Sequence, residues 1–463
     1  MKKLLSVILF LCCFSISALK FNYVYSAERI KINNSNFSKV KLAINIDESK
    51  EHAEKIFLQE MFDIISNDLQ NSNLFEILNS QIFIENKYGV ENIPHFPSWT
   101  IIKTNLILNI SLKQTFNILN ISFIIWDVIL KKPIIKKLNL KVDKKDIRKI
   151  SHYISDLIYE YSTGYEGYFN SRIVYVSESG KYKNRIKKLA IMDYDGYNHE
   201  YLTNGKKIVS SPRFFPDGKK ILYMAYENKI PRVFIMDLQS KNSKMIGNFN
   251  NISFAPNISP NGKEIIMSIA QNGKSHIYEY NINSEIFRQL TFGDHINTSP
   301  CYSPCGKYII FNSNRTNKRD LFIMRRSDNK VFKLTQDQGS YAEPKWSNKN
   351  WIAFTKMHRT LGFTIGILNI SDKDIFKSER IIATAYLAES PAWNHNGRML
   401  IFTKGYRLSN AKNKKFTEYN IKNLNKLCLI DAFGIYEEKI INTPEDASDA
   451  DWTQTYVNFE TNA

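Results

Sequence analysis

The 463-residue sequence has few cysteines. Two of the five, Cys12 and Cys13, lie in an apolar stretch near the N-terminus. The other three, Cys301, Cys305 and Cys428, form an odd set that predicts no disulfide framework. Cys301 and Cys305 stand inside a repeated motif, and no second pair follows them at a zinc-site spacing, so we expect no metal site.

Recognisable catalytic motifs are also lacking. The sequence contains neither a G-x-S-x-G nucleophile elbow nor an H-E-x-x-H zinc motif. Its eight histidines are never paired three or four positions apart, and we interpret each as a surface or turn residue: His52, His95, His152, His199, His276, His295, His358 and His395. These absences predict a protein that is not an enzyme and that needs no cofactor.

Long apolar runs are limited to the N-terminus. Residues 4–19 are almost without polarity and follow Lys2 and Lys3. A run of about 15 residues is shorter than the ~20 that a membrane-spanning helix needs, so residues 1–27 are predicted to be a signal peptide. Cleavage after Ala18 and cleavage after Ala27 both fit. The exported chain would lie in the periplasm with no transmembrane segment.

Basic residues outnumber acidic ones. The formal charge is +18, and residues 1–27 hold three lysines and no acid, so the exported chain would carry +15. Such a surface attracts an anionic membrane or an acidic protein, whereas export argues against nucleic acid as a partner. Lysine, asparagine and isoleucine are abundant in every segment. An AT-rich genome explains this bias as readily as a selected basic site does.

A repeated motif begins at residue 211. Its copies are SPRFFPDGK (211–219), APNISPNGK (255–263), SPCYSPCGK (299–307), EPKWSNKNW (343–351) and SPAWNHNGR (390–398). Their opening prolines lie at 212, 256, 300, 344 and 391. A period close to 44 residues is typical of the four-stranded blade of a β-propeller.

Each repeat predicts four short strands separated by turns. In the second repeat we expect them at 256–259, 263–269, 275–280 and 287–290. Pro-Asp-Gly and Pro-Asn-Gly suit tight turns, because Pro presets φ and Gly accepts a positive value. A strand at 173–177 lacks a Pro-rich partner, and residues 449–453 resemble that partner. The last strand is therefore predicted to complete the first blade and close a ring of six blades without a free edge.

The N-terminal part lacks the repeat. Alternating patterns predict strands at 40–46, 105–112, 116–128 and 133–142, and apolar residues at helical spacing predict helices at 53–71 and 146–161. The expected fold is a multidomain chain, with a small N-terminal α/β domain (38–165) followed by an all-β, six-bladed propeller (166–463). A polar insertion at 406–419 predicts an exposed loop in the last repeat.

Three features carry a resemblance to a known family. They are TG at 163–164 with GYF at 167–169 leading into RIVYV at 172–176, MDYDGYN at 192–198, and the repeats above. With them, residues 28–463 resemble the TolB family, the periplasmic propeller proteins of the Tol-Pal system. The resemblance implies a scaffold that bridges the lipoprotein Pal and TolA, with room for other envelope partners. Such a scaffold maintains the outer membrane and envelope constriction during cell division.

In TolB-like proteins, Pal docks over the propeller mouth, on the loops that precede the Ser-Pro motifs. The resemblance therefore implies these Pal-binding residues: Ser210, Ser211, Ile252, Phe254, Ala255, Thr298, Ser299, Ala342, Glu343, Glu389 and Ser390. The family often has a histidine at the position of Ile252, so this contact differs from the family pattern.

The family's second contact is a segment at the mature N-terminus, which pairs with TolA as an added strand. The matching residues, within a partner-binding segment at 28–37, are Glu28, Arg29, Ile30, Lys31, Ile32, Asn33 and Asn34. Their alternation of polar and apolar side chains suits strand addition. A disordered leader without a partner is the alternative reading.

The sequence is also compatible with a function of a different class from the protein-binding scaffold. A propeller can bind a small ligand, a glycan or a peptide in its central channel, and polar side chains that converge in a deep channel pocket would favour that function.

Overall fold

The computed structural model describes residues 38–47, 51–85, 89–180, 184–247, 251–336, 338–358, 361–409, 421–433 and 438–454. The predicted signal peptide and the predicted TolA-binding residues lie outside these ranges. The described residues up to Asn170 form one compact unit, and Ser171–Gln454 form a second.

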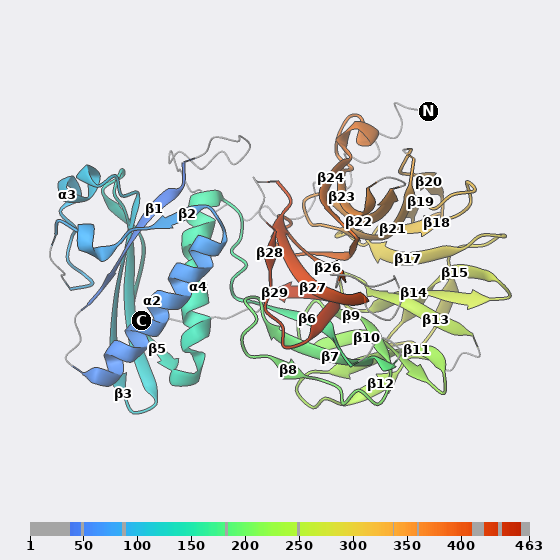
Figure 1. The fold of residues 1–463 in the computed structure, drawn as a ribbon, viewed down its shortest axis with the longest axis horizontal. Coiled ribbons are helices and arrows are strands. Elements are labelled where there is room, and N and C mark those ends of the chain that lie inside the picture. Colours follow the sequence, from blue (N-terminus) through green and yellow to red (C-terminus); the bar gives the residue numbers. More distant parts are fainter. Residues whose placement is uncertain are drawn as a thin grey trace. The chain divides into compact units, whose positions relative to one another are not determined.

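The N-terminal unit is built on a five-stranded mixed sheet with the order β2-β1-β3-β4-β5 (Figure 1). Parallel pairs join β1 to β2 and to β3, and antiparallel pairs join β3, β4 and β5. The strands are β1 (Val40–Ile46), β2 (Phe75–Ile77), β3 (Leu106–Thr115), β4 (Ile118–Asp127) and β5 (Lys132–Asp143).

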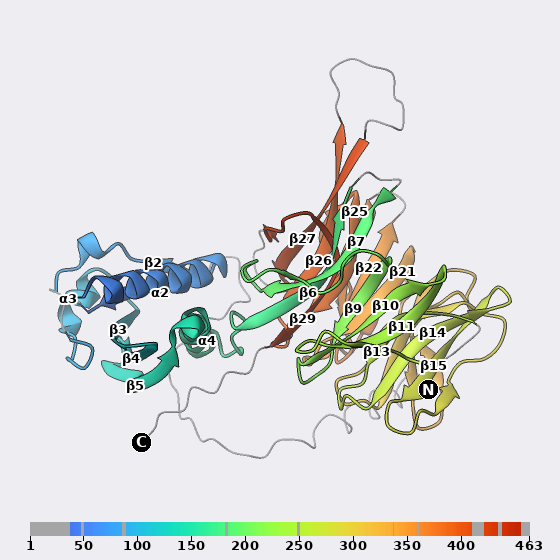
Figure 2. The ribbon, with the colours of Figure 1, turned by 90° about the horizontal axis from the view of Figure 1, so that it is seen from below.

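Two amphipathic helices, α2 (His52–Asn71) and α4 (Ile147–Thr163), pack side by side in this unit (Figures 1 and 2). The second ends at Gly164, whose φ of 74° is a left-handed conformation that glycine adopts without strain. A short helix, α3 (Phe96–Ile101), adds Trp99 to the core around Ile107 and Trp126. Short 3₁₀ turns lie at Ser80–Ile82 and Lys144–Asp146. No described helix is both long enough and apolar enough to cross a membrane.

The described strands of the second unit form six four-stranded antiparallel sheets, which we number as blades 1 to 6. Blade 1 contains β29 (Asp446–Gln454), β6 (Ser171–Ser179), β7 (Ile186–Asp193) and β8 (Glu200–Tyr201). Blade 2 contains β9 (Val209–Phe214), β10 (Lys220–Glu227), β11 (Ile230–Asp237) and β12 (Ser243–Met245). Blade 3 contains β13 (Ile252–Ile258), β14 (Glu264–Gln271), β15 (Lys274–Asn281) and β16 (Phe287–Gln289).

The remaining blades follow the same order. Blade 4 contains β17 (Asn297–Tyr302), β18 (Tyr308–Ser313), β19 (Asp320–Arg325) and β20 (Val331–Lys333). Blade 5 contains β21 (Ser340–Trp346), β22 (Trp351–His358), β23 (Gly362–Asn369), a 3₁₀ turn at Ile375–Ser378 and β24 (Arg380–Ala385). Blade 6 contains β25 (Leu387–Trp393), β26 (Met399–Ser409), β27 (Ile421–Asp431) and β28 (Lys439–Ile440).

Ring closure follows the predicted scheme. The strands β9, β13, β17, β21, β25 and β29 contact one another in succession and form the innermost ring. The C-terminal strand β29 pairs with β6, and Trp452 lies opposite Ile173. The N-terminal α/β fold and the six-bladed propeller are thereby confirmed.

Some element boundaries differ from the predicted ones. Strand β13 begins at Ile252, four residues before Pro256, because the strand continues through the proline as a bulge. Phe116 has a positive φ in the turn before β4 and does not start the strand. Strand β26 continues to Ser409, so 406–409 belong to a strand, and 410–420 lie outside the described residues. The patterns also did not indicate β2 and α3, because each is only one short segment.

Candidate functional site

Every innermost strand carries the same irregularity. A β-bulge interrupts its pairing, and the residue before the motif proline, or before Ala450 in β29, has a positive φ. These residues are Ser211 (53°), Ala255 (48°), Ser299 (54°), Glu343 (51°), Ser390 (54°) and Asp449 (53°). Proline has no N–H that could bond to the neighbouring strand, and a bulge leaves one residue of a strand unpaired. The proline of the repeated motif therefore explains the bulge in five of the six innermost strands.

We call the face where the innermost strands begin the mouth of the propeller. Three isoleucines stand four residues before the Pro212, Pro256 and Pro300 steps and are exposed by 52%, 45% and 44%: Ile208, Ile252 and Ile296. The equivalent residues of blades 5, 6 and 1 are Ser340, Leu387 and Asp446. Because these isoleucines occupy consecutive blades, the mouth has an apolar arc on blades 2 to 4.

Carboxylates gather on the other side of the mouth. Glu343 of blade 5 accepts hydrogen bonds from the Ser390 backbone N–H at 2.7 Å and from the Thr355 hydroxyl at 2.8 Å. Glu389 of blade 6 is half-buried beside it. Burial, followed by the charges of Glu343 and Asp449, raises the pKa of Glu389 to about 7. This part of the mouth, formed by Glu343, Glu389 and Asp449, is the acidic side.

Cations lie beside these carboxylates on the innermost strands. Arg213 of blade 2 pairs with Asp449 of blade 1 at 3.2 Å, and Asp451 accepts from the Phe214 backbone N–H at 2.8 Å. Burial, together with the charge of Arg213, lowers the pKa of Lys345 to about 8. Lys345 belongs to blade 5, opposite blade 2 in the ring, so charged side chains from facing blades converge on the central channel.

A cavity of about 300 Å³ opens between blades 3 and 4. Its walls combine apolar, hydroxyl, amide and cationic side chains: Phe254, Ile296, Thr298, Ser299, Asn312, Asn314 and Arg319. Three of these, Phe254, Thr298 and Ser299, belong to the predicted Pal-binding set. The cavity therefore lies within the surface that the resemblance assigned to the partner.

The predicted residues fall into separate places around the mouth. Phe254, Thr298 and Ser299 meet at the cavity, whereas Glu343, Glu389 and Ser390 meet on the acidic side. The Ser211 backbone N–H donates to Asp449 at 2.5 Å. Half-buried Ala255 lies within the bulge of β13, half-buried Ala342 comes just before the bulge of β21, and exposed Ile252 belongs to the apolar arc.

Several mouth residues were not predicted. Ile208 and Ile296 repeat the position of Ile252 at the 44-residue period, so the aligned repeats contained the signal that identifies them. No local pattern marks Arg319 or Asn312, because they reach the cavity from β18 and the segment that follows it. Asp449 is distant in sequence from its partner Arg213.

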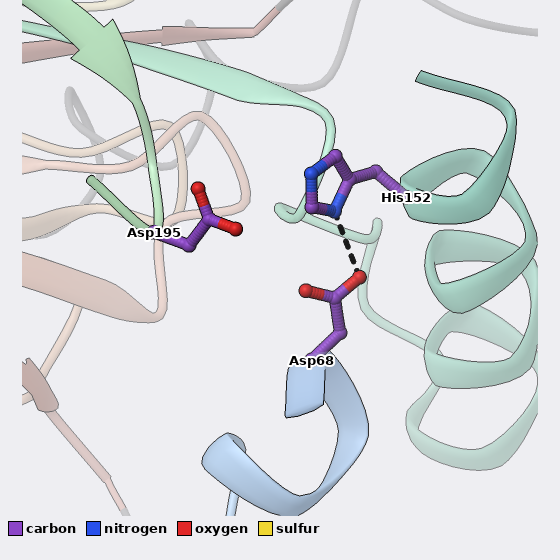
Figure 3. Close-up of side chains that lie close together, drawn as sticks. All are labelled: Asp68, His152 and Asp195. Atoms are coloured by element: carbon purple, nitrogen blue, oxygen red, sulfur yellow. Dashed lines mark hydrogen bonds and ion pairs between the residues drawn. The ribbon is translucent and has the colours of Figure 1, made fainter. Parts of the chain in front are cut away.

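The N-terminal unit contains a buried polar cluster of its own. His152 Nδ1 on α4 lies 2.8 Å from Asp68 Oδ2 on α2, and both side chains are almost fully buried (Figure 3). The interpretation of His152 as a surface residue is therefore wrong. Nearby, Asp156 accepts hydrogen bonds from the backbone N–H groups of Phe169 and Asn170, while burial raises its pKa to about 7. The first contact holds α2 against α4, and the second holds residues 169–170, at the end of this unit, against α4.

Comparisons with known proteins cover both units. The family model described as the TolB amino-terminal domain matches residues 28–134, and the model described as the TolB beta propeller domain matches residues 159–455. A Tol-Pal system protein TolB from Rickettsia rickettsii (strain Sheila Smith) is 40% identical over 435 residues, which are 93% of this chain and 95% of that protein. The corresponding protein of Rickettsia massiliae (strain Mtu5) is 41% identical with the same coverage.

A solved structure agrees with the fold. The crystal structure of TolB from Acinetobacter baumannii superposes with a TM-score of 0.75 at 22% identity, and the match covers 90% of this chain and 97% of that one.

Proposed function

This chain belongs to the TolB family of Tol-Pal system proteins, and from that premise we propose that it is a protein-binding scaffold of the periplasm. In this proposal it bridges Pal and TolA, maintains the outer membrane and supports constriction of the envelope during cell division. Catalysis has no part in this role.

The mouth of the propeller is the proposed Pal-binding surface. The observation that carries this proposal is the apolar arc of Ile208, Ile252 and Ile296, three exposed isoleucines at equivalent positions of neighbouring blades. An exposed apolar patch bordered by polar groups is typical of a protein interface. The cavity beside Ile296 adds a concave feature that a partner side chain can fill.

TolA is the second proposed partner. The proposal assigns its contact to residues 28–34, which lie outside the described part of the chain. Their sequence supports pairing as an added strand, because polar and apolar residues alternate over several positions.

Binding of a small ligand in the channel is the second candidate. It is favoured by the convergence of Arg213, Lys345 and Asp451 from three blades on the channel. These charges also neutralise one another: Arg213 pairs with Asp449, and the charge of Asp451 opposes the lowering of the Lys345 pKa. The internal pairing supports a structural role for this cluster, so the scaffold remains our conclusion.

Calorimetric titration of residues 28–463 with Pal from the same cell, at two salt concentrations, tests the proposal. Micromolar or tighter binding that weakens only modestly with salt is expected for a packed interface. The variant Thr298→Arg places a long cation in the cavity and is expected to weaken binding at least about tenfold. No binding by the wild-type chain would refute the assignment to Pal and leave the channel ligand as the function to test.

A further inference from the structure

The hairpin between β3 and β4 in the N-terminal unit ends on an exposed phenylalanine. Phe116 is 89% exposed, more than any other large apolar side chain among the described residues. Thr115 pairs with Ile118, so Phe116 and Asn117 form a two-residue turn. Because the ring of Phe116 buries little area against its own chain, packing within the fold does not explain this residue.

The chemistry of the turn does not explain the phenylalanine either. Phe116 has a φ of 53°. Two-residue hairpin turns favour glycine, asparagine or aspartate at a positive φ, because other side chains strain the backbone there. An aromatic residue at this position therefore costs stability, which points to a contact outside the chain.

A second apolar side chain and two lysines lie close to the turn. Ile118, the first residue of β4, is 39% exposed. Lys113 on β3 and Lys141 on β5 both lie opposite Asn120 of β4, so the three residues share one face of the sheet. Both lysines are exposed, and neither has an ion pair with a described residue.

The segment that follows β5 adds positive charge at the same end of the sheet. The Lys144 backbone N–H donates to the Asn117 carbonyl at 3.1 Å, so this segment lies beside the hairpin turn (Figure 1). The Lys144 ammonium group lies 5.9 Å from the centre of the Phe57 ring.

The acidic side chains near the turn already have partners within the unit. These partners are Lys145 for Asp143 at 3.5 Å, Lys149 for Asp146 at 2.5 Å, and the Gln114 backbone N–H for Glu54 at 2.8 Å. Lys113 and Lys141 are therefore positive charges that remain available to an anion from outside.

A lipid surface suits this hairpin better than a folded partner does. A stable protein interface buries about 800 Å² on each partner, whereas the end of the hairpin offers two apolar side chains. A bilayer needs no complementary shape. An aromatic ring can enter the boundary between headgroups and acyl chains while lysines beside it meet the lipid phosphates.

We propose that the β3–β4 hairpin attaches the protein to an anionic lipid surface. Phe116 inserts between the lipids, and Lys113 and Lys141 lie against their phosphates. A single inserted ring gives weak and reversible attachment. This inference is independent of the proposed binding of Pal and TolA.

Sedimentation of residues 28–463 with lipid vesicles gives the first test. The anionic vesicles contain equal parts of phosphatidylcholine and phosphatidylglycerol, and the reference vesicles contain phosphatidylcholine alone. We expect the anionic vesicles to bind at least about tenfold more strongly, and the difference to shrink as added salt screens the charges.

The variant Phe116→Asn separates loss of the lipid contact from loss of the fold. Asparagine tolerates a positive φ, so the variant should melt at or above the temperature of the wild-type chain. Its affinity for anionic vesicles should fall about fivefold or more, because the inserted ring is gone. The matched control is Phe292→Asn, which removes a 65% exposed ring from the propeller and should change the affinity less than about twofold.

Charge reversal separates a contact at the hairpin from attraction by the whole basic chain. Lys141→Glu should weaken binding to anionic vesicles about tenfold, because attraction to the phosphates becomes repulsion. Lys307→Glu makes the same change on an exposed lysine of the propeller and should change the affinity less than about twofold.

Insertion itself can be measured with Phe116→Trp. Vesicles that carry brominated acyl chains quench an indole that enters the bilayer. The chain already contains six tryptophans, so the wild-type chain gives the reference signal. Phe116→Trp should show additional quenching, and Phe292→Trp should not.

The outcomes separate this inference from the proposed function. Loss of vesicle binding in Phe116→Asn and Lys141→Glu, but not in their controls, is the result that we expect. Equal affinities of each variant and its control would overturn the inference, as would a wild-type chain that does not bind anionic vesicles. Neither result would affect the scaffold, and a failure to bind Pal would refute the proposed function without affecting the lipid contact.

Discussion

At the scale of single residues, the acidic side of the mouth places like charges together. Glu389 is half-buried, and the burial of its carboxyl and the charges of Glu343 and Asp449 oppose its ionisation. Neutral Glu389 avoids this repulsion, and ionised Glu389 adds to it. The stability of the propeller should therefore depend on the protonation of this residue.

The sign of the dependence follows from the raised pKa. The contribution of Glu389 to stability is fully present below the unfolded pKa, near 4.5, and is lost as the pH rises to about 7. Glu389→Gln should therefore raise the free energy of unfolding at pH 8 by about 1–2 kcal/mol, because solvent at a half-buried site reduces the ~1.4 kcal/mol expected per pKa unit. Denaturant unfolding at pH 4.5 and pH 8 measures the change.

The expected gain nearly vanishes at pH 4.5, where both side chains are neutral in the folded protein. Glu200→Gln is a suitable control, since Glu200 is exposed and pairs with Lys241 at the surface, where ion pairs contribute little. Equal gains at both pH values would contradict the proposed repulsion at the mouth.

At the scale of elements, the bulges of the innermost strands set the backbone conformation of the mouth. A left-handed conformation costs a residue with a Cβ atom about 1–2 kcal/mol and costs glycine little. Ala255 adopts this conformation, with a φ of 48°, so its backbone is strained by that amount in the folded protein. Its conformation persists because the pairing of β13 with β14 resumes on both sides of the bulge.

Substitutions at Ala255 test this account. Ala255→Val should lower the free energy of unfolding by about 1–2 kcal/mol, because a β-branched side chain fits a positive φ poorly. Ala255→Gly should raise it by up to about 1 kcal/mol. The control Ala270→Val lies opposite Ile252 on β14 in a regular strand conformation and should be neutral or slightly favourable. A neutral Ala255→Val would show that the bulge is not strained.

Prediction from the sequence succeeded where a feature recurs. The 44-residue period identified the blades, and the unpaired strand at 173–177 identified how the ring closes, because four-stranded blades need a partner for every inner edge. The segments β2 and α3 were missed, since neither is long enough to show a period. The mouth was predicted only as loops, because its pairs join residues far apart in sequence, such as Arg213 with Asp449 and Glu343 with Ser390. A local sequence pattern gives no information about contacts between residues so far apart in the chain.

At the scale of the whole propeller, closure depends on one strand from the C-terminal end of the described chain. Strand β29 pairs with β6 and also contacts the innermost strands β9 and β25 of the neighbouring blades. The Trp452 indole is buried and donates to the Ser171 hydroxyl at 2.6 Å. Asp449 and Asp451 bond to blade 2. Removing this strand would leave β6 as an open edge and uncover the channel side of two blades.

Deletion of residues 447–463 should therefore abolish cooperative unfolding of the propeller. Each blade is stabilised by its two neighbours, and a ring without β29 loses the contacts of that strand with the blade on either side. Calorimetry and near-ultraviolet circular dichroism measure the transition and the tertiary packing. Trp452→Phe is the matched control: it keeps an aromatic ring, removes the bond to Ser171 and should cost about 1 kcal/mol while leaving one cooperative transition. A truncated chain that melts at the temperature of the intact chain would mean that five complete blades and an open sixth suffice, and that closure by β29 contributes nothing to stability.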